Sequence, residues 1–171
     1  MEIRVASLTD TPDIDRIARA SFDRVYAYFA RRGRRHADLV LIAEDDSSPV
    51  GFLEGNVFGG SPLIGYVYFV ATDPTHRGKG IARALVENAL REFAQRRTTR
   101  VFAGISRGNR PSEALFASLG FERIPRRRLW TWYRWRGLLL PQRMLLAPHE
   151  VLYAYTFADL SRASNEKALG P

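Results

Sequence analysis

The chain contains no cysteine and only two lysines among its 171 residues. Without cysteine, the sequence excludes disulfide bridges and a catalytic thiol. The three histidines, His36, His76 and His149, are too scattered to suggest a metal site, so we expect none. The sequence also lacks the roughly 20 consecutive apolar residues that span a bilayer, and its first residues lack the apolar core of a secretory signal. We therefore expect a cytoplasmic protein with no membrane partner.

Acidic residues are few, 18 against 26 lysines and arginines, which gives a formal net charge of +8. This excess favours anionic partners, among them nucleotides, phosphorylated cofactors and nucleic acids, and does not choose between them. The length and an apolar fraction of 46% favour one globular domain with its own core. We place this domain at residues 1–160 and expect a polar C-terminal tail at 161–171.

Apolar periodicity predicts an alternating α/β order of strands and helices. Repeats of three to four residues indicate amphipathic helices, and short runs of β-branched and aromatic residues indicate strands. We expect a loop containing Pro141 and Pro148 between the last two strands. The expected helices are 11–22, 24–32, 80–97 and 109–119, and the expected strands are 3–6, 39–43, 50–58, 64–71, 101–105, 129–135 and 151–157.

The segment ATDPTHRGKG, residues 71–80, joins one of these strands to the longest helix. The first turn of a helix has amide hydrogens without intrahelical partners and carries partial positive charge, so it attracts anions. Gly78 and Gly80 would let a ligand approach the backbone closely, and Arg77 and Lys79 add formal positive charge. The simpler interpretation is a tight turn whose basic residues are incidental.

Two other phosphate-binding motifs do not fit this segment. A nucleotide P-loop needs Gly-Lys-Ser/Thr four residues after its first glycine, and the chain has no such run. The dinucleotide fingerprint needs a third glycine or alanine where Arg83 stands, and an acidic residue that the strand 101–105 lacks.

From about residue 3 to residue 157 the chain resembles the GNAT superfamily of acyl-CoA-dependent N-acyltransferases. The family pattern Gln/Arg-x-x-Gly-x-Gly/Ala is met by residues 77–82, and the customary Val-Ala-Thr-Asp-Pro precedes it at 70–74. Each motif is weak by itself, and the resemblance depends on their joint occurrence in the expected order. A second family pattern, Asn with an aromatic residue seven positions later and then Gly-Phe, is met by Asn109, Phe116, Gly120 and Phe121.

The resemblance implies a fold, a co-substrate and a set of binding residues. The fold would be a single α/β (α+β) GNAT-like domain with a mixed, mostly antiparallel sheet of six to seven strands flanked by helices. The co-substrate would be acetyl-CoA, with its pyrophosphate on the amides of the turn before the long helix and its pantetheine arm along the preceding strand. The implied binding residues are Val70, Ala71, Thr72, Arg77, Gly78, Lys79, Gly80, Ile81, Ala82, Arg83, Asn109 and Phe116.

Catalytic side chains are harder to assign. Phe116 stands where many relatives have a tyrosine that protonates the thiolate, so water or another hydroxyl such as Tyr68 would replace it. The two positions where relatives carry a catalytic glutamate hold Tyr66 and Gly104. Glu54 is the nearest carboxylate candidate, although we expect it to be a solvent-exposed strand residue.

The segment RRRLWTWYRWRG, residues 126–137, offers a competing function. Read as a strand, it would interleave arginines with aromatics that stack on the bases of RNA or single-stranded DNA. We favour a sheet strand whose tryptophans are core and whose arginines cover the rim.

We therefore expect an N-acetyltransferase that transfers an acetyl group from acetyl-CoA to a primary amine by direct attack. The acceptor would be a small-molecule or peptide amine, and a homodimer is left open. The alternatives are a CoA-binding module with little turnover and a nucleic-acid-binding protein that uses residues 126–136.

Overall fold

The computed structural model describes residues 1–59 and 62–158, which form two compact units. The first unit comprises residues 1–57 and 67–95, and the second comprises residues 58–66 and those from 96 onward. The first holds β1 (Glu2–Val5), α1 (Thr11–Ser21), α2 (Arg24–Gly33), β2 (Leu39–Asp45), most of β3 (Ser48–Phe58) and β4 (Ile64–Thr72), and α3 (Ile81–Gln95). The second holds the start of β4 with β5 (Arg100–Ser106), α4 (Arg110–Ser118), β6 (Glu122–Ile124), α5 (Arg127–Tyr133), α6 (Arg136–Arg143) and β7 (Glu150–Thr156).

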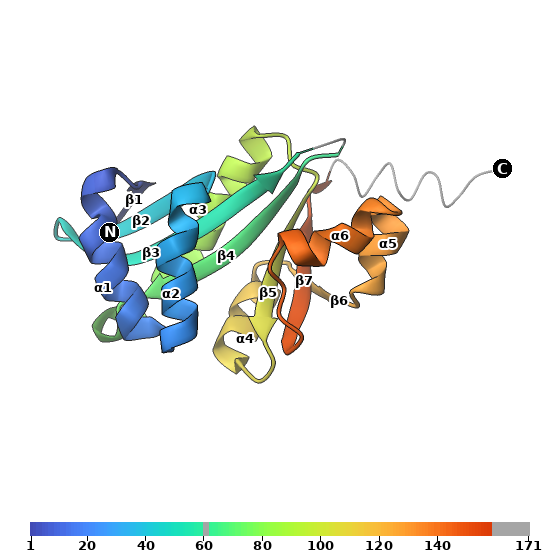
Figure 1. The fold of residues 1–171 in the computed structure, drawn as a ribbon. Coiled ribbons are helices and arrows are strands. Elements are labelled where there is room, and N and C mark those ends of the chain that lie inside the picture. Colours follow the sequence, from blue (N-terminus) through green and yellow to red (C-terminus); the bar gives the residue numbers. More distant parts are fainter. Residues whose placement is uncertain (60–61, 159–171) are drawn as a thin grey trace. The chain divides into compact units, whose positions relative to one another are not determined.

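The predicted fold class is confirmed within the described residues. Seven strands follow the order β1-β2-β3-β4-β5-β7-β6, and six α-helices accompany them (Figure 1). The pairings β1–β2, β2–β3, β5–β7 and β6–β7 are antiparallel. Most expected elements lie within a few residues of their predicted bounds, because their apolar periodicity is local and clear.

In the first unit, helices cover both faces of the strands. Phe52 belongs to a core cluster that α1 and α2 close on one face. The neighbouring Gly51 points the opposite way, where a Cβ would lie 2.8 Å from the Ile81 side chain of α3. This alternation is that of a strand buried on both faces. The cluster under α1 and α2 contains Ile14, Ile17, Ala18, Ala30, Ile42, Phe52 and Ala71.

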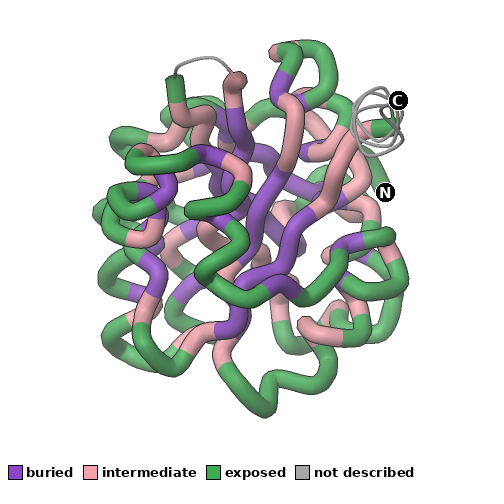
Figure 2. The backbone as a smooth tube through the Cα atoms, turned by 90° about the vertical axis from the view of Figure 1, so that its right-hand side faces the viewer, coloured by how far each residue is buried: buried purple, intermediate pink, exposed green. Residues whose placement is uncertain are grey.

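In the second unit, β5 and β7 pair with Phe102 opposite Ala154 and Val101 opposite Tyr155. The Phe102 ring contacts α5, with 6.2 Å between its centroid and that of Tyr133. On the other face, the ring of Phe121 lies 5.5 Å from that of Tyr155. Figure 2 shows buried residues concentrated along the strands, and turns that are mostly exposed.

The expected strand at 129–135 is wrong, because residues 127–133 form α5 and α6 begins at Arg136. The buried residues Leu129 and Tyr133 are one helical turn apart, a period that the alternating arginines and aromatics obscured. At Gly137 a Cβ would lie only 2.2 Å from the Leu129 carbonyl oxygen, so α5 and α6 pack closely enough to require glycine there.

The structure differs from the sequence prediction in smaller details as well. Pro141 lies inside α6 and not in a loop, and β6 was not predicted. Asp10 is the N-cap residue of α1, and its carboxylate accepts a hydrogen bond from the Ser7 amide at 2.6 Å. The expected tail at 161–171 lies outside the described residues.

Candidate functional site

The turn between β4 and α3 is held in place by Asp73. Its carboxylate accepts hydrogen bonds from the Thr75 amide at 3.1 Å, the Thr75 hydroxyl at 2.7 Å and Arg16 Nη1 at 2.6 Å. The Thr75 hydrogen bonds, and then that of Arg16, lower the pKa of Asp73 to about 2. Asp73 is therefore ionised at neutral pH and fixes the start of the turn.

Two glycines shape the rest of this turn. Gly78 and Gly80 have φ angles of +79° and +78°, which lie in the left-handed region that favours glycine. No heavy atom lies within 4 Å of a Cβ built at either position, so the structure requires glycine there for backbone conformation and leaves open space beside it. A ligand can therefore reach the backbone at this point.

The turn leads into a helix that attracts anions. α3 runs for 15 residues from Ile81, with Ile81, Leu85 and Phe93 buried, so packing fixes its direction. Its first turn carries Arg83 and no acidic residue.

Arg77 and Lys79 precede this helix and are exposed. Lys79 Nζ lies 4.0 Å from Asp45 Oδ2, an exposed pairing that contributes little. Formal charge and helix dipole therefore act together on any anion at residues 77–83.

The strand before the turn is partly engaged by protein. The Thr72 carbonyl accepts a hydrogen bond from the Ser21 hydroxyl at 3.1 Å. The Thr72 hydroxyl is buried and has no hydrogen-bond partner among the described residues. Buried polar groups are normally paired, so this hydroxyl is an exception to the usual pattern.

Glu54 is buried, contrary to the sequence expectation. Its residue is 1% exposed, and its Oε1 has no hydrogen-bond partner among the described residues. Burial raises its pKa to about 8, with Arg34 opposing the shift and Asp15 reinforcing it. Arg34 cannot neutralise Glu54 fully, because its Nη1 donates to Asp15 Oδ1 at 2.9 Å. The end of α2 covers this carboxyl, with 3.8 Å between Oε2 and a Cβ built on Gly33.

Tyr66 and Gly104 are the two positions matched to family glutamates, and they lie next to each other in the second unit. A Cβ on Gly104 would lie 2.6 Å from the Tyr66 hydroxyl and 3.0 Å from Glu150 Oε2. Glu150 is oriented by the Ala147 amide, which donates to Oε2 at 2.8 Å. A carboxylate thus comes close to the position where relatives carry one, although it comes from β7.

Sequence reasoning missed Glu150. The register that pairs Ser106 with Glu150 and Gly104 with Leu152 joins segments about 45 residues apart, and no local pattern reports it. Tyr68 is partly buried, belongs to the first unit and stacks on Phe69 at 6.4 Å.

The second motif has structural roles in the second unit. Asn109 caps α4, its Oδ1 accepting a hydrogen bond from the Ser112 amide at 3.3 Å. Phe116 is 3% exposed and packs edge-on against Phe121 with 5.0 Å between ring centroids. The side chain of Phe116 is therefore core.

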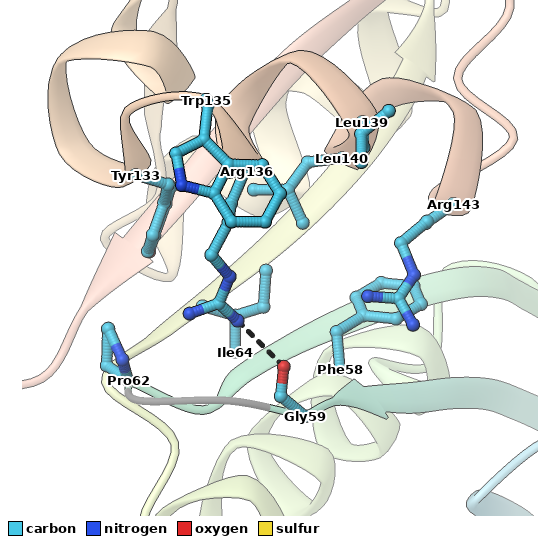
Figure 3. Close-up of a pocket in the computed structure, with 10 residues that line it drawn as sticks. All are labelled: Phe58, Gly59, Pro62, Ile64, Tyr133, Trp135, Arg136, Leu139, Leu140 and Arg143. Atoms are coloured by element: carbon cyan, nitrogen blue, oxygen red, sulfur yellow. Dashed lines mark hydrogen bonds between the residues drawn. The ribbon is translucent and has the colours of Figure 1, made fainter.

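Within the described residues, no group of three His, Asp or Glu side chains gathers to hold a metal ion. A cavity of about 190 Å³ lies between α6, the end of β3 and the start of β4 (Figure 3). Its lining has no carboxylate and no histidine, so it offers no proton acceptor. It is lined by Phe58, Gly59, Pro62, Ile64, Tyr133, Trp135, Arg136, Leu139, Leu140 and Arg143.

The chain resembles known acetyltransferases in sequence. It is 34% identical over 125 residues to L-2,4-diaminobutyric acid acetyltransferase from Nocardia farcinica, a match covering 71% of this chain and 64% of that protein. It is 37% identical over 89 residues to mycothiol acetyltransferase from Kocuria rhizophila, covering 50% of this chain and 29% of that protein. The matches thus span less than two thirds of either relative.

A solved structure and a family model agree with the fold. The structure is a GNAT family N-acetyltransferase from Escherichia coli in complex with CoA, with a TM-score of 0.66 and 25% identity over 92% of this chain and 82% of that one. The model of the acetyltransferase (GNAT) family matches residues 5–121. Because this match covers more than half of the chain, the protein belongs to the acetyltransferase (GNAT) family.

Proposed function

We propose that this chain transfers an acetyl group from acetyl-CoA to a primary amine by direct attack. The observation that carries the proposal is the turn at residues 77–83, where two left-handed glycines lead into a helix N-terminus flanked by cations. Its amides and cations suit the pyrophosphate of CoA. Val70, Ala71 and Thr72 would pair with the pantetheine arm through their backbone groups.

In this reaction the amine nitrogen attacks the thioester carbonyl and the C–S bond breaks. The proton lost by the amine needs an acceptor, and the thiolate of CoA needs a proton. Residues 1–171 contain no cysteine, which supports direct transfer without an acyl-cysteine. Asn109 and Phe116 stay predicted as CoA contacts through the family resemblance.

One carboxyl suits the role of proton acceptor. We assign the proton acceptor to Glu150, since it lies with the Tyr66 hydroxyl beside Gly104, where family members carry a glutamate. Glu54, with its pKa raised to about 8, keeps its proton at neutral pH, which counts against a base role, and water can protonate the thiolate. Tyr68 is the alternative donor.

CoA binding tests the turn directly. Reversing Arg77 and Lys79 to glutamate together should weaken CoA binding by at least about tenfold, or roughly 1.4 kcal/mol, in titration calorimetry. The matched control reverses Arg32 and Arg35, two exposed arginines of the same unit, and should leave the affinity nearly unchanged. Equal loss in both variants would mean that only net charge matters, and the assignment of the turn would fail.

Turnover tests the enzyme against a CoA-binding module. Release of free CoA thiol is followed with a panel of amines, starting with 2,4-diaminobutyric acid because of its place in a relative's name. Acceptor-dependent release supports the transferase, and tight CoA binding without release supports the module. In an active enzyme, Glu150→Gln should lower kcat more than it changes KM for the amine. The cytoplasmic location and a homodimer stay predictions.

A further inference from the structure

The segment from residue 126 to residue 145, called here the α5–α6 segment, combines strong positive charge with exposed apolar side chains. It contains six arginines and no acidic residue. Of the eleven exposed large hydrophobic residues in the described part of the chain, five lie here: Trp130, Trp135, Leu138, Leu139 and Leu145. Such a concentration on a protein surface marks an interaction site.

Packing of the fold leaves all five of these residues exposed, although Trp135 and Leu139 also line the cavity of Figure 3. The α5–α6 segment already has an inner face, on which Leu129, Tyr133, Leu140 and Met144 are buried. A helix at the surface of a water-soluble domain normally has a polar outer face. Here the outer face also carries apolar side chains, so contact with an apolar partner would be more favourable than contact with water.

The outer apolar residues of α6 share one side. Trp135, Leu138 and Leu139 are spaced i, i+3 and i+4, which places them together on a helix, and they are 66%, 63% and 48% exposed. Leu145 follows at 68% exposed.

Two of the six arginines hold α6 in place. Arg136 Nη2 donates to the Gly59 carbonyl at 2.8 Å, and the Arg143 guanidinium lies 5.8 Å from the Phe58 ring centroid, so both reach from α6 toward residues 58–59 (Figure 3). Arg127 and Arg128 are exposed at the start of α5. These two arginines are available to attract an anionic surface.

We propose that the α5–α6 segment binds the surface of anionic lipid bilayers. Helices that lie in a membrane interface combine arginines with tryptophan and leucine, the residue types exposed here. Arginines near an anionic leaflet strengthen binding, and tryptophans favour the headgroup level. A nucleic acid would use the arginines and stack on the tryptophans, but it gives no role to Leu138, Leu139 and Leu145.

This mode of binding requires no spanning segment. Within the described residues, no helix is long and apolar enough to cross a bilayer. The sequence analysis expected no membrane partner because the chain has no spanning segment. A helix that lies in the membrane interface needs no spanning segment, so the two statements are compatible.

Flotation of the full chain with vesicles tests the proposal without acetyl-CoA or amine, so its outcome is independent of the proposed transferase. We expect binding to vesicles of phosphatidylglycerol and phosphatidylcholine, much weaker binding to phosphatidylcholine alone, and a blue shift of tryptophan fluorescence. Arg127→Gln with Arg128→Gln should weaken binding by about 25-fold, at about fivefold per arginine. Leu138→Gln with Leu139→Gln should weaken it by at least about tenfold.

Matched controls change the same residue types elsewhere. Leu8→Gln removes a leucine that is 92% exposed in the first unit, and Arg32→Gln with Arg35→Gln removes two exposed arginines there. Both controls should bind vesicles like the wild type. Absence of binding to anionic vesicles overturns the proposal. Unchanged vesicle binding by the Leu138→Gln, Leu139→Gln variant also overturns it. If the chain in addition binds single-stranded RNA tightly at physiological salt, the α5–α6 segment is a nucleic-acid-binding surface.

Discussion

Glu54→Gln removes the titration of a buried carboxyl while keeping its shape. Burial raises the pKa of Glu54 from 4.5 to about 8. The gap of about 3.5 pH units is equivalent to about 5 kcal/mol at 1.36 kcal/mol per unit, an upper bound on the stability that this group can shift.

The sign follows from the two protonation states. Below pH 4.5 the carboxyl is protonated in both the folded and the unfolded chain, so the stability linked to this group is fully present. Between pH 4.5 and about 8 the unfolded chain loses the proton while the folded chain keeps it, so the free energy of unfolding falls as pH rises. Above about pH 8 the loss is complete.

Urea unfolding of wild type and Glu54→Gln at about pH 5 and pH 8 measures the effect. Relative to wild type, the variant should gain about 4 kcal/mol between these two pH values, since its amide does not titrate. Glu122→Gln, at an exposed carboxyl, controls for the amide replacement itself. A stability difference between wild type and Glu54→Gln that stays constant with pH would mean that burial does not hold the proton on Glu54.

Three further substitutions test the fold and the turn. Gly80→Ala places a Cβ in the left-handed region, at φ +78°, and should destabilise the protein by about 1–2 kcal/mol in thermal unfolding while weakening CoA binding; unchanged affinity would count against the turn as the CoA site. Arg4→Gln removes the hydrogen bonds that hold the pKa of Asp10 well below its usual range. The ionised Asp10 carboxylate stabilises the folded chain above the ordinary pKa of Asp10, and this contribution is lost as pH falls. The variant should therefore be less stable than wild type at neutral pH, and the difference should shrink below about pH 3. Phe116→Ala should cost about 3–5 kcal/mol in urea unfolding, since the side chain is 3% exposed and packs on Phe121; a loss under about 1 kcal/mol would show that it is not core.

The sequence predicted the features that depend on neighbouring residues. Gly78 and Gly80 have the positive φ angles that a tight turn before a helix needs, and the apolar repeat from Ile81 places α3 correctly. Asn109 caps α4, as its chemistry and position indicate. Each of these depends on residues only a few positions apart.

The segment 129–135 shows where local reasoning failed. Its aromatics favour a strand, but α5 forms because Leu129 and Tyr133 pack toward the core one helical turn apart and Gly137 of α6 allows close contact with α5. Packing between elements overrode local propensity there.

The sequence alone was enough to predict the cationic turn between strand and helix and the helix that follows it, because turn and cap chemistry depend on residues a few positions apart. Two features could be seen only in the folded chain: Glu54 is buried under the end of α2, and Glu150 lies beside Gly104. Burial and the meeting of side chains depend on which distant segments pack together, and strand register over about 45 residues leaves no local pattern in the sequence.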